Sequence, residues 1–495
     1  MKKMPLRQRD DPPGHGERAR RLAPRLGAAL LAALALAACI SVGPDYRRPA
    51  TQAPAAYKEL DGWKPAEPGQ AASGSPWWSI YGDPVLDQLE QQVDVSNQNL
   101  KAAEAAYRQA EALVGEARAG YFPSLGLGAS AQRQRAFSAA TGSVLQNDFG
   151  VSASASWAPD LWGRIRRGVE ASSASAQASA DDVAAARLSA QSSLAADYFA
   201  LRVADELKGL LQQTVAAYQD TLEITRNQFD AGVVAQTDVI SAETQLEGTQ
   251  AQLINAGVQR AQLEHAIAVL VGKAPAEFSL PPSPLLRNVP VVPAGLPSTL
   301  LERRPDIAGA ERRMAAANAQ IGVAVAAYYP DLTLAGSYGF ASSTLGSLLR
   351  AANTVWSVGP QLSETLFDGG LRRSQVAAAR AAYDQDVATY RQTVLAAFQQ
   401  VEDELSTLRI LEQQADLQDV AVRSAREAVR LTLNQYEAGT VAYTSVVTAQ
   451  AIALSDEQAV LAVLGSRLAA SVALVAATGG GWDSAAGAKP VASSR

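Results

Sequence analysis

Few residues of this chain could perform chemistry of their own. The 495 residues include one cysteine, Cys39, and two histidines, His15 and His265. A single cysteine can form neither an intrachain disulfide nor a cysteine-based metal site, and an isolated histidine on a helix is more often structural than a ligand. No paired nucleophile and base, no metal-ligand cluster and no phosphate-binding Gly-rich loop stands out. The sequence therefore indicates a protein that is not an enzyme and that uses no cofactor and no metal.

Covalent lipidation is the chemistry that Cys39 does suggest. Eight basic residues precede the apolar run 26–38, an order typical of a signal peptide. The run ends Leu36-Ala37-Ala38-Cys39, which resembles the lipobox of bacterial lipoproteins. This resemblance implies cleavage after residue 38 and a diacylated, N-acylated Cys39 that carries palmitate-type chains. Ordinary cleavage that leaves a free thiol is the alternative. Residue Ile40 follows, not Asp, which resembles outer-membrane sorting in Gram-negative lipoproteins.

The charge balance excludes one class of partner. The whole chain has a net charge of −6, and its first 38 residues carry eight basic and three acidic side chains. Removal of the leader therefore makes the remaining chain more acidic by five charges. Nucleic-acid binding requires a basic face, so we expect no nucleic-acid partner.

The sequence contains a long internal repeat in two copies. Residues 227–239 read N-Q-F-D-A-G-V-V-A-Q-T-D-V, and residues 434–446, at an offset of 207, read N-Q-Y-E-A-G-T-V-A-Y-T-S-V. The same offset superposes Y-F-P-x-L-x-L at 121–127 on Y-Y-P-x-L-x-L at 328–334. Each copy is far longer than a solenoid repeat. The predicted organisation is a signal peptide (1–38), a lipid-anchored arm that leads into the first repeat (39–96), repeat 1 (97–272), a Pro-rich linker (273–303), repeat 2 (304–479) and a flexible tail (480–495).

The doubled motif has the character of a helix end. Gly232 and Gly439 suit the left-handed position just past a helix C-terminus. A few residues later, Thr237-Asp238 and Thr444-Ser445 offer side-chain oxygens that could cap the next helix. We expect each motif to be the tip of a helical hairpin, with a continuous kinked helix as the alternative.

Short alternating segments follow the Y-F-P and Y-Y-P motifs. Apolar residues alternate with Ser and Gly at 125–131, 149–157 and 332–340, and a similar run covers 356–362. Runs of about ten alternating residues bordered by aromatic residues are typical of outer-membrane β-barrel strands, although soluble hairpins can show the same pattern. We expect the apolar set to face lipid and the Ser and Gly set to face the lumen. The residues that represent the lipid-facing set are Leu127, Val151, Leu334 and Val358.

Four strands cannot close a barrel, because the smallest known membrane barrels have eight. Open strand edges are not tolerated in lipid, so several chains must contribute to one barrel. Two chains would give eight strands with a filled interior, and three would give twelve strands with room for a lumen. The sequence predicts an oligomer and favours a trimer.

A long helical pattern follows each pair of strands, at 164–231 and 370–438. About 67 residues of helix span roughly 100 Å. Both segments are rich in Ala, Ser and Gln, with Leu or Val at heptad-like spacing, and the small residues allow helices to approach closely. Shorter helices are expected at about 239–271 and 446–478. We interpret all of these helices as the wall of the structure.

Together these features resemble the TolC-like outer-membrane factors, specifically the lipidated NodT-type efflux lipoproteins. The most specific matches are V-G-P-D-Y-R-R-P at 42–49, L-P-S-x-L-L-x-R-R-P-D-I at 296–307 and L-F-D-G-G at 366–370. The resemblance implies a mainly α-helical mixed fold, with a helical coiled-coil barrel continuous with a trimeric twelve-stranded transmembrane β-barrel. It also implies a periplasmic adaptor (membrane fusion) protein and an inner-membrane transporter, usually of the resistance-nodulation-division type, as partners. The expected location is the outer membrane of a Gram-negative bacterium, in contact with its lipids.

The same resemblance places a periplasmic gate at the hairpin tips. Asp238 matches an acidic residue of that gate in several members, and Tyr436 matches a tyrosine that restrains it. Ser445 and Thr448 stand at positions where other members carry acids, and Val441 stands where they carry an arginine. This chain therefore lacks most of the charged residues that hold this gate closed in other members. An ordinary helix cap is the alternative role for Asp238.

The function that these patterns favour is an outer-membrane exit duct of a tripartite efflux system, passively conducting small molecules such as drugs. A structural or adhesive coiled-coil lipoprotein would explain the helices and the lipid but not the four amphipathic strands. A duct for type I protein secretion is a further alternative. The sequence does not identify the cargo.

Overall fold

The computed structural model describes residues 41–49, 53–54, 56–59, 76–138, 142–292 and 303–480. The signal peptide, Cys39, part of the linker and nearly all of the C-terminal tail lie outside these residues. The helices are α2 (Pro84–Ser96), α3 (Gln98–Ala119), α4 (Arg164–Asp230), α5 (Gln236–Leu270), α7 (Pro305–Ala326), α8 (Leu371–Glu437) and α9 (Tyr443–Ala477). The strands are β1 (Ser124–Ser138), β2 (Gly142–Trp157), β3 (Asp331–Ser342) and β4 (Thr354–Ser363). Short 3-10 turns are η1 (Trp77–Tyr81), η2 (Pro275–Glu277), η3 (Leu345–Ser347) and η4 (Ala351–Asn353).

The predicted internal repeat is confirmed. Helices α3, α4 and α5 and helices α7, α8 and α9 have the same lengths, 22, 67 and 35 residues in each set. Each helix of the second set begins 207 residues after its counterpart, as at residues 164 and 371. The strands obey the offset at their first residues, since β1 begins at 124 and β3 at 331. The chain therefore builds one substructure twice.

Residues 84–119 form two helices, because the chain is broken at Asn97, whose backbone is extended and whose Oδ1 accepts a hydrogen bond from the Leu100 N–H. Its Nδ2 donates to the Leu270 carbonyl at 2.8 Å, so a tertiary contact fixes the break. The strands are also less uniform than expected. β1 and β2 have 15 and 16 residues, whereas β3 and β4 have 12 and 10.

The chain forms two compact units that cut across the repeats. Unit 1 comprises Met1–Arg47, Glu111–Ala174 and Ala315–Gln385, and unit 2 comprises Arg48–Ala110, Ser175–Met314 and Asp386–Arg495. Unit 1 contains the four strands and the helix ends next to them. Unit 2 contains the remaining helices and both hairpin tips.

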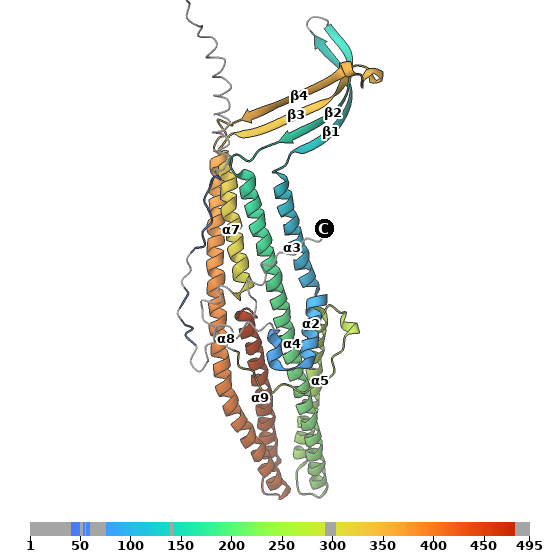
Figure 1. The fold of residues 1–495 in the computed structure, drawn as a ribbon. Helices are drawn as coiled ribbons and strands as arrows, with labels where there is room; N and C mark the ends of the chain where they lie inside the picture. The colour runs from blue at the N-terminus through green and yellow to red at the C-terminus, as the bar shows by residue number, and fades with distance from the viewer. Residues whose placement is uncertain are drawn as a thin grey trace, which may run out of the picture. The chain divides into compact units, whose positions relative to one another are not determined.

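The four strands of unit 1 form one antiparallel sheet in the order β1-β2-β3-β4 (Figure 1). Its register pairs Leu127 with Ala153, Ala129 with Val151, and Trp157 with Leu334. Because directly opposed residues point to the same side of a sheet, the apolar set shares one face across all four strands. The partners on the opposite face include Gly126 with Ser154, Gly128 with Ser152, and Ser337 with Ser357. β1 and β4 remain edge strands in the single chain.

The core of unit 2 gathers the helices around α4. Fully buried Leu194, Tyr198 and Leu201 of α4 pack with Leu86 of α2 and Leu468 of α9. α9 is the one described helix that is long and apolar enough to cross a membrane by length and composition alone. Its most apolar stretch has a mean hydropathy of 2.0 and is 44% buried by the rest of the chain. Leu468 and Leu474 of α9 lie in core clusters, so this helix packs against the rest of the chain.

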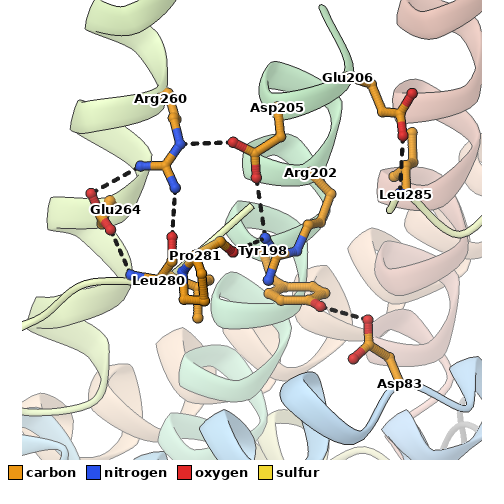
Figure 2. Close-up of polar contacts among 10 residues, drawn as sticks. All are labelled: Asp83, Tyr198, Arg202, Asp205, Glu206, Arg260, Glu264, Leu280, Pro281 and Leu285. Carbon is orange, nitrogen blue, oxygen red and sulfur yellow. Dashed lines mark hydrogen bonds and ion pairs between the residues drawn. The ribbon is translucent and has the colours of Figure 1, made fainter. Parts of the chain in front are cut away.

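A polar cluster joins the linker to the α4–α5 hairpin. Figure 2 shows that Arg202 and Arg260 both bind the carboxylate of Asp205, at 3.1 and 2.7 Å. Arg202 also donates to the carbonyl of Pro281 at 2.8 Å, and Arg260 donates to that of Leu280 at 2.5 Å. Arg202 is almost fully buried, so this cluster lies where an unpaired charge would be costly. The chain after α5 is therefore held against its own hairpin.

Candidate functional site

Each hairpin tip closes with the same backbone motif. Gly232 and Gly439 have φ values of +74° and +70°, as the sequence predicts for left-handed positions. After α4, the Gly232 N–H donates to the Phe229 carbonyl and the Val233 N–H donates to the Gln228 carbonyl, at 2.8 and 2.9 Å. The same pair of bonds follows α8. This is the six-to-one and five-to-two pattern that satisfies the last helix carbonyls.

The cap predicted for the returning helices is wrong. The N-cap of α5 is Ala235 and that of α9 is Ala442, and neither side chain makes a capping bond. The hairpin turn brings the chain into the helix two residues before Thr237, so Asp238 lies in the first turn of α5. An acidic side chain there is favourable beside the helix dipole. Among the described residues, none donates a hydrogen bond to the half-buried Asp238 carboxylate.

Tyr436 lies where the two hairpins meet. It is 2% exposed and packs in an apolar cluster with Tyr218 and Leu222 of α4 and Tyr443 of α9. Its hydroxyl donates to Oγ1 of Thr225, on the other hairpin, at 3.3 Å. Burial raises the pKa of Tyr436, and the nearby charge of Asp238 raises it further while the bond to Thr225 lowers it. Tyr436 and Asp238 are therefore close enough to interact electrostatically, although Tyr436 bonds to Thr225.

A second neutral link runs parallel to the first. Gln450 of α9 donates from Nε2 to Oγ1 of Thr221 at 3.3 Å, and its Oε1 accepts a bond from Gln245 of α5 at 3.2 Å. Gln450 and Thr221 are 6% and 3% exposed. α4, α5 and α9 thus share one buried hydrogen-bond chain, and α8 joins α4 through Tyr436. We call Tyr436, Thr225, Gln450, Thr221 and Gln245 the neutral latch.

The other predicted gate residues lie apart from this latch. Ser445 and Thr448 are exposed on α9, and the hydroxyl of Thr448 donates to the carbonyl of Thr444 in its own helix. The sequence-based reading also missed Thr221, Thr225, Gln245 and Gln450. A signal for one of them existed in the repeat, because Gln450 stands 207 residues after Glu243. Glu243 forms an ion pair with Arg226 at 2.6 Å, whereas the counterpart of Arg226 is Leu433. At this repeat position the first hairpin therefore forms an ion pair within itself, whereas the second hairpin uses Gln450 to bond to the first.

The N-terminal arm is clamped onto unit 1 by one arginine. Arg167 of α4 is 4% exposed, and its guanidinium donates to the carbonyls of Val42 and Gly43 at 3.3 and 3.4 Å. The same group binds the carboxylates of Asp45 and Glu170 at 2.7 and 2.8 Å. Although burial alone would lower the pKa of Arg167, these two carboxylates raise it above its usual value. The motif at 42–49 therefore supplies the arm's acceptor groups to a charge-assisted contact with Arg167, which we call the arm clamp.

Backbone geometry completes the arm clamp. Gly43 has a φ of +93°, and a side chain there would come within 2.5 Å of Cα of Gly322 on α7. Only glycine permits this close approach. Asn318 of α7 adds a bond to the Pro44 carbonyl at 3.0 Å, and the Val42 N–H donates to the Trp162 carbonyl at 3.2 Å.

Aromatic residues gather where the strands join the helices. Trp157 donates from its indole to the Tyr121 carbonyl at 2.9 Å, and Trp162 donates to the Pro330 carbonyl at 2.8 Å. The ring of Trp162 stacks on Tyr329 with a centroid distance of 4.8 Å. Such amphipathic rings are enriched at membrane–water interfaces. This end of the sheet therefore has the chemistry of an interfacial belt.

The sequence and the fold were compared with known proteins. The chain matches the family described as "Outer membrane efflux protein" in two segments, residues 89–273 and 296–480. It is 30% identical over 451 residues to the Antibiotic efflux pump outer membrane protein ArpC and to the Toluene efflux pump outer membrane protein TtgC, both of Pseudomonas putida, covering 89% of this chain and 93% of each relative.

A solved structure gives the same result. The outer-membrane channel OprN superposes with a TM-score of 0.83 at 31% identity, over 89% of this chain and 99% of that one. The two family segments begin 207 residues apart, the offset at which the helices repeat. This chain belongs to the outer membrane efflux protein family, a family of outer-membrane transport channels and not of enzymes.

Proposed function

We propose that three copies of this chain form the exit duct of a tripartite efflux system, and the observation that carries this is the register of the sheet. One face of all four strands is apolar and largely exposed, as at Leu125 and Leu127, which are both 82% exposed. Among the described residues, the edge strands β1 and β4 each pair with one strand only. Because lipid does not tolerate open edges, three chains would close the sheet as twelve strands around a lumen.

The duct needs partners that supply cargo and energy. Among the described residues, no group of His, Cys, Asp or Glu could hold a metal ion, and the family consists of outer membrane efflux proteins. We therefore assign energy coupling to an inner-membrane transporter of the resistance-nodulation-division type, and the link to it to a periplasmic adaptor protein. The two hairpin tips of unit 2, which turn at Gly232 and Gly439, are the surface we assign to that assembly.

Small, largely apolar molecules are the cargo class we propose. The support is that the relatives with 30% identity are named for antibiotic and toluene efflux pumps. A protein-secretion duct remains the competing assignment. Deletion of the gene should raise susceptibility to antibiotics or solvents at least several-fold and leave the secreted proteins unchanged. The opposite result would favour protein secretion.

The docked arm supports lipidation of Cys39. Val42 stands three positions after Cys39, and three extended residues span about 10 Å. Val42 lies beside Trp162 in the aromatic belt. Acyl chains on Cys39 would thus enter the inner leaflet close to the strand–helix junction, where several buried methylenes anchor firmly. Intact-mass analysis should show a mature chain that begins at an acylated Cys39, and an unmodified Cys39 would refute the assignment.

The resting duct is closed at the hairpin tips in this proposal. The neutral latch ties one hairpin to the other, and three copies of Asp238 would surround the opening. Like charges in a narrow constriction attract cations and set ion selectivity. Because the latch contains no ion pair, added salt should change closure only modestly.

Planar-bilayer recording of the purified protein tests the duct itself. We expect small cation-selective conductance at rest that increases in variants with a disrupted latch. A structural or adhesive lipoprotein would insert without conducting, and absence of conductance in correctly assembled, membrane-inserted oligomers would refute the duct.

A further inference from the structure

The outer end of the β1–β2 hairpin carries a pair of cations on the apolar face of the sheet. Arg133 and Arg135 alternate in step with Leu125 and Leu127, so all four side chains point to the same side. Both arginines are exposed. Among the residues that the structure describes, neither guanidinium has a hydrogen-bond or ion-pair partner.

The register gives these arginines a depth in the membrane. At about 3.4 Å per residue and a tilt of about 40°, Arg133 lies roughly 20 Å above Leu125 along the membrane normal, and Arg135 lies roughly 26 Å above it. The apolar band of an outer-membrane barrel is about 25 Å tall. The two guanidiniums therefore bracket the outer edge of the band, at the depth of the lipid headgroups.

No protein carboxylate is available to pair with them. The only acid in the outer part of the hairpin, residues 131–149, is Asp148, which pairs with Gln132 on the opposite face of the sheet. The β3–β4 connection, residues 343–353, contains no acid and adds Arg350. A neighbouring copy would contribute the same segments and hence no further acid. An otherwise acidic protein thus carries a cationic outer end.

The surroundings of the pair suit an amphiphilic ligand. Phe137 lies on the same face just beyond the arginines, and Leu145 lies directly opposite Arg135; they are 81% and 50% exposed. Asn147 lies opposite Arg133 and offers an uncharged amide. A guanidinium binds phosphate oxygens in a two-pronged geometry that an ammonium group cannot reproduce. This face therefore presents hydrogen-bond donors for phosphate, flanked by apolar side chains.

We propose that Arg133 and Arg135 bind the phosphate groups of phosphorylated glycolipid in the outer leaflet, in the manner of lipid A. The proposal rests on the membrane-spanning barrel proposed above. The lipid phosphates replace the missing carboxylates, and the acyl chains pack on the apolar face below. Bound lipid would fix the height of the outer hairpin and cover the exposed Phe137.

Native mass spectrometry of delipidated trimers with added bisphosphorylated lipid A tests the site. Arg133→Gln with Arg135→Gln should weaken lipid binding by about tenfold or more, because interfacial cations dominate attraction to anionic lipid. The matched control is Arg350→Gln, which removes one charge at the same end and should stay within about twofold of wild type. Lipid A without phosphates should bind wild type as weakly as bisphosphorylated lipid A binds the double variant.

Three outcomes overturn the proposal. The first is wild-type affinity in the double variant, and the second is an equal loss in Arg350→Gln, which would show only a general charge effect. The third is full competition by millimolar inorganic phosphate, which would indicate a free-phosphate site. Conductance of the double variant in a plain phospholipid bilayer separates this test from that of the duct. It should match wild type, because neither arginine faces the lumen.

Discussion

Tyr436 shows how a single residue can join the two hairpins of the proposed gate without an ion pair. Its repeat counterpart is Phe229, which is 41% exposed, whereas Tyr436 is 2% exposed. The difference of one hydroxyl allows the second hairpin to bond to Thr225 of the first. Since buried hydroxyls need partners, this bond constrains both where the ring packs and which hairpin it contacts.

Tyr436→Phe should raise the resting open probability roughly 2- to 10-fold, the effect of one lost neutral hydrogen bond. Single-channel recording measures it. Tyr443→Phe is the matched control, because that tyrosine is buried in the same cluster and its hydroxyl has no described partner. An equal response in both variants would show that packing, not the bond, holds the tips.

Asp238→Ala should weaken cation preference more than it widens the pore. The half-buried carboxylate accepts no hydrogen bond from the described residues, so in the proposed gate its charge would be available to passing ions. Reversal potentials in a salt gradient report the preference. Asp238→Asn, which removes charge with little change in shape, should match the alanine variant. Unchanged selectivity in both would place the constriction elsewhere.

Glu90 should make the stability of the fold depend on pH. Both carboxylate oxygens are buried and have no hydrogen-bond partner in the part of the chain that the structure describes. Burial, and then the charge of Asp94, raise the pKa of Glu90 to about 9. Below about pH 4.5, a carboxyl whose pKa is raised on folding is protonated in both states and does not change the free energy of unfolding. As the pH rises towards 9, it lowers the free energy of unfolding, because it ionises readily only in the unfolded chain.

Glu90→Gln should therefore raise thermal stability at pH 8 by several degrees and change it little at pH 5. Thermal unfolding followed by circular dichroism between pH 5 and pH 9 measures the difference. The control is Glu404→Gln, a glutamate of unit 2 whose pKa is also raised by burial but that is not fully buried, so its effect should be smaller. A difference independent of pH would show that Glu90 is ionised in the folded state.

At the scale of elements, the four strands support the assignment to the membrane, and the helices form the wall of the structure. Val151 lies on the apolar face opposite Ala129 and Phe340. Ser154, three residues on, lies on the other face opposite Gly126 and Ser337. Because the side-chain period of a strand is two, adjacent positions have opposite environments.

Val151→Arg should cost about 2–4 kcal/mol near the midplane and reduce trimer assembly. Ser154→Arg should assemble normally and change conductance, because its side chain would enter the lumen. The fraction of trimer on native gels and the single-channel conductance test the pair. Equal tolerance of arginine at both sites would mean that these strands do not span the membrane.

At the scale of the whole molecule, the arm clamp connects the proposed lipid anchor to the strand–helix junction. Arg167 gathers two arm carbonyls and two carboxylates in a buried position. Removing one partner of a buried charged cluster is costly because the other charges stay behind. The clamp thus fixes the position of residues 42–45, from which the proposed acyl chains on Cys39 would extend.

Arg167→Gln should release the arm and raise the rate of trypsin cleavage after Arg47 by roughly tenfold or more. Arg167→Lys should restore little of the resistance to trypsin, because an ammonium group lacks the forked guanidinium geometry that reaches several acceptors. The control is Arg164→Gln, since Arg164 forms only an exposed 3.8 Å ion pair with Asp331. A clamp without a role would leave the Arg167 variants as resistant as this control.

Much of this architecture is a direct consequence of sequence. Helix lengths, the hairpin glycines and the alternation of the strands are local properties, because each depends on neighbouring residues and a fixed period. The internal repeat could be read from an offset of 207, and the helices obey it. Family membership followed from motifs within continuous segments.

Tertiary structure decided what depends on contacts between distant segments. The break at Asn97 requires the Leu270 carbonyl, and the neutral latch joins Tyr436 to Thr225, 211 residues away. The arm clamp needs Arg167 to meet Gly43 across 124 residues. The absence of side-chain caps at Ala235 and Ala442 followed from where the turns place the chain. Pair distances of this kind are not encoded in local periodicity, so only the folded chain reveals which polar groups meet.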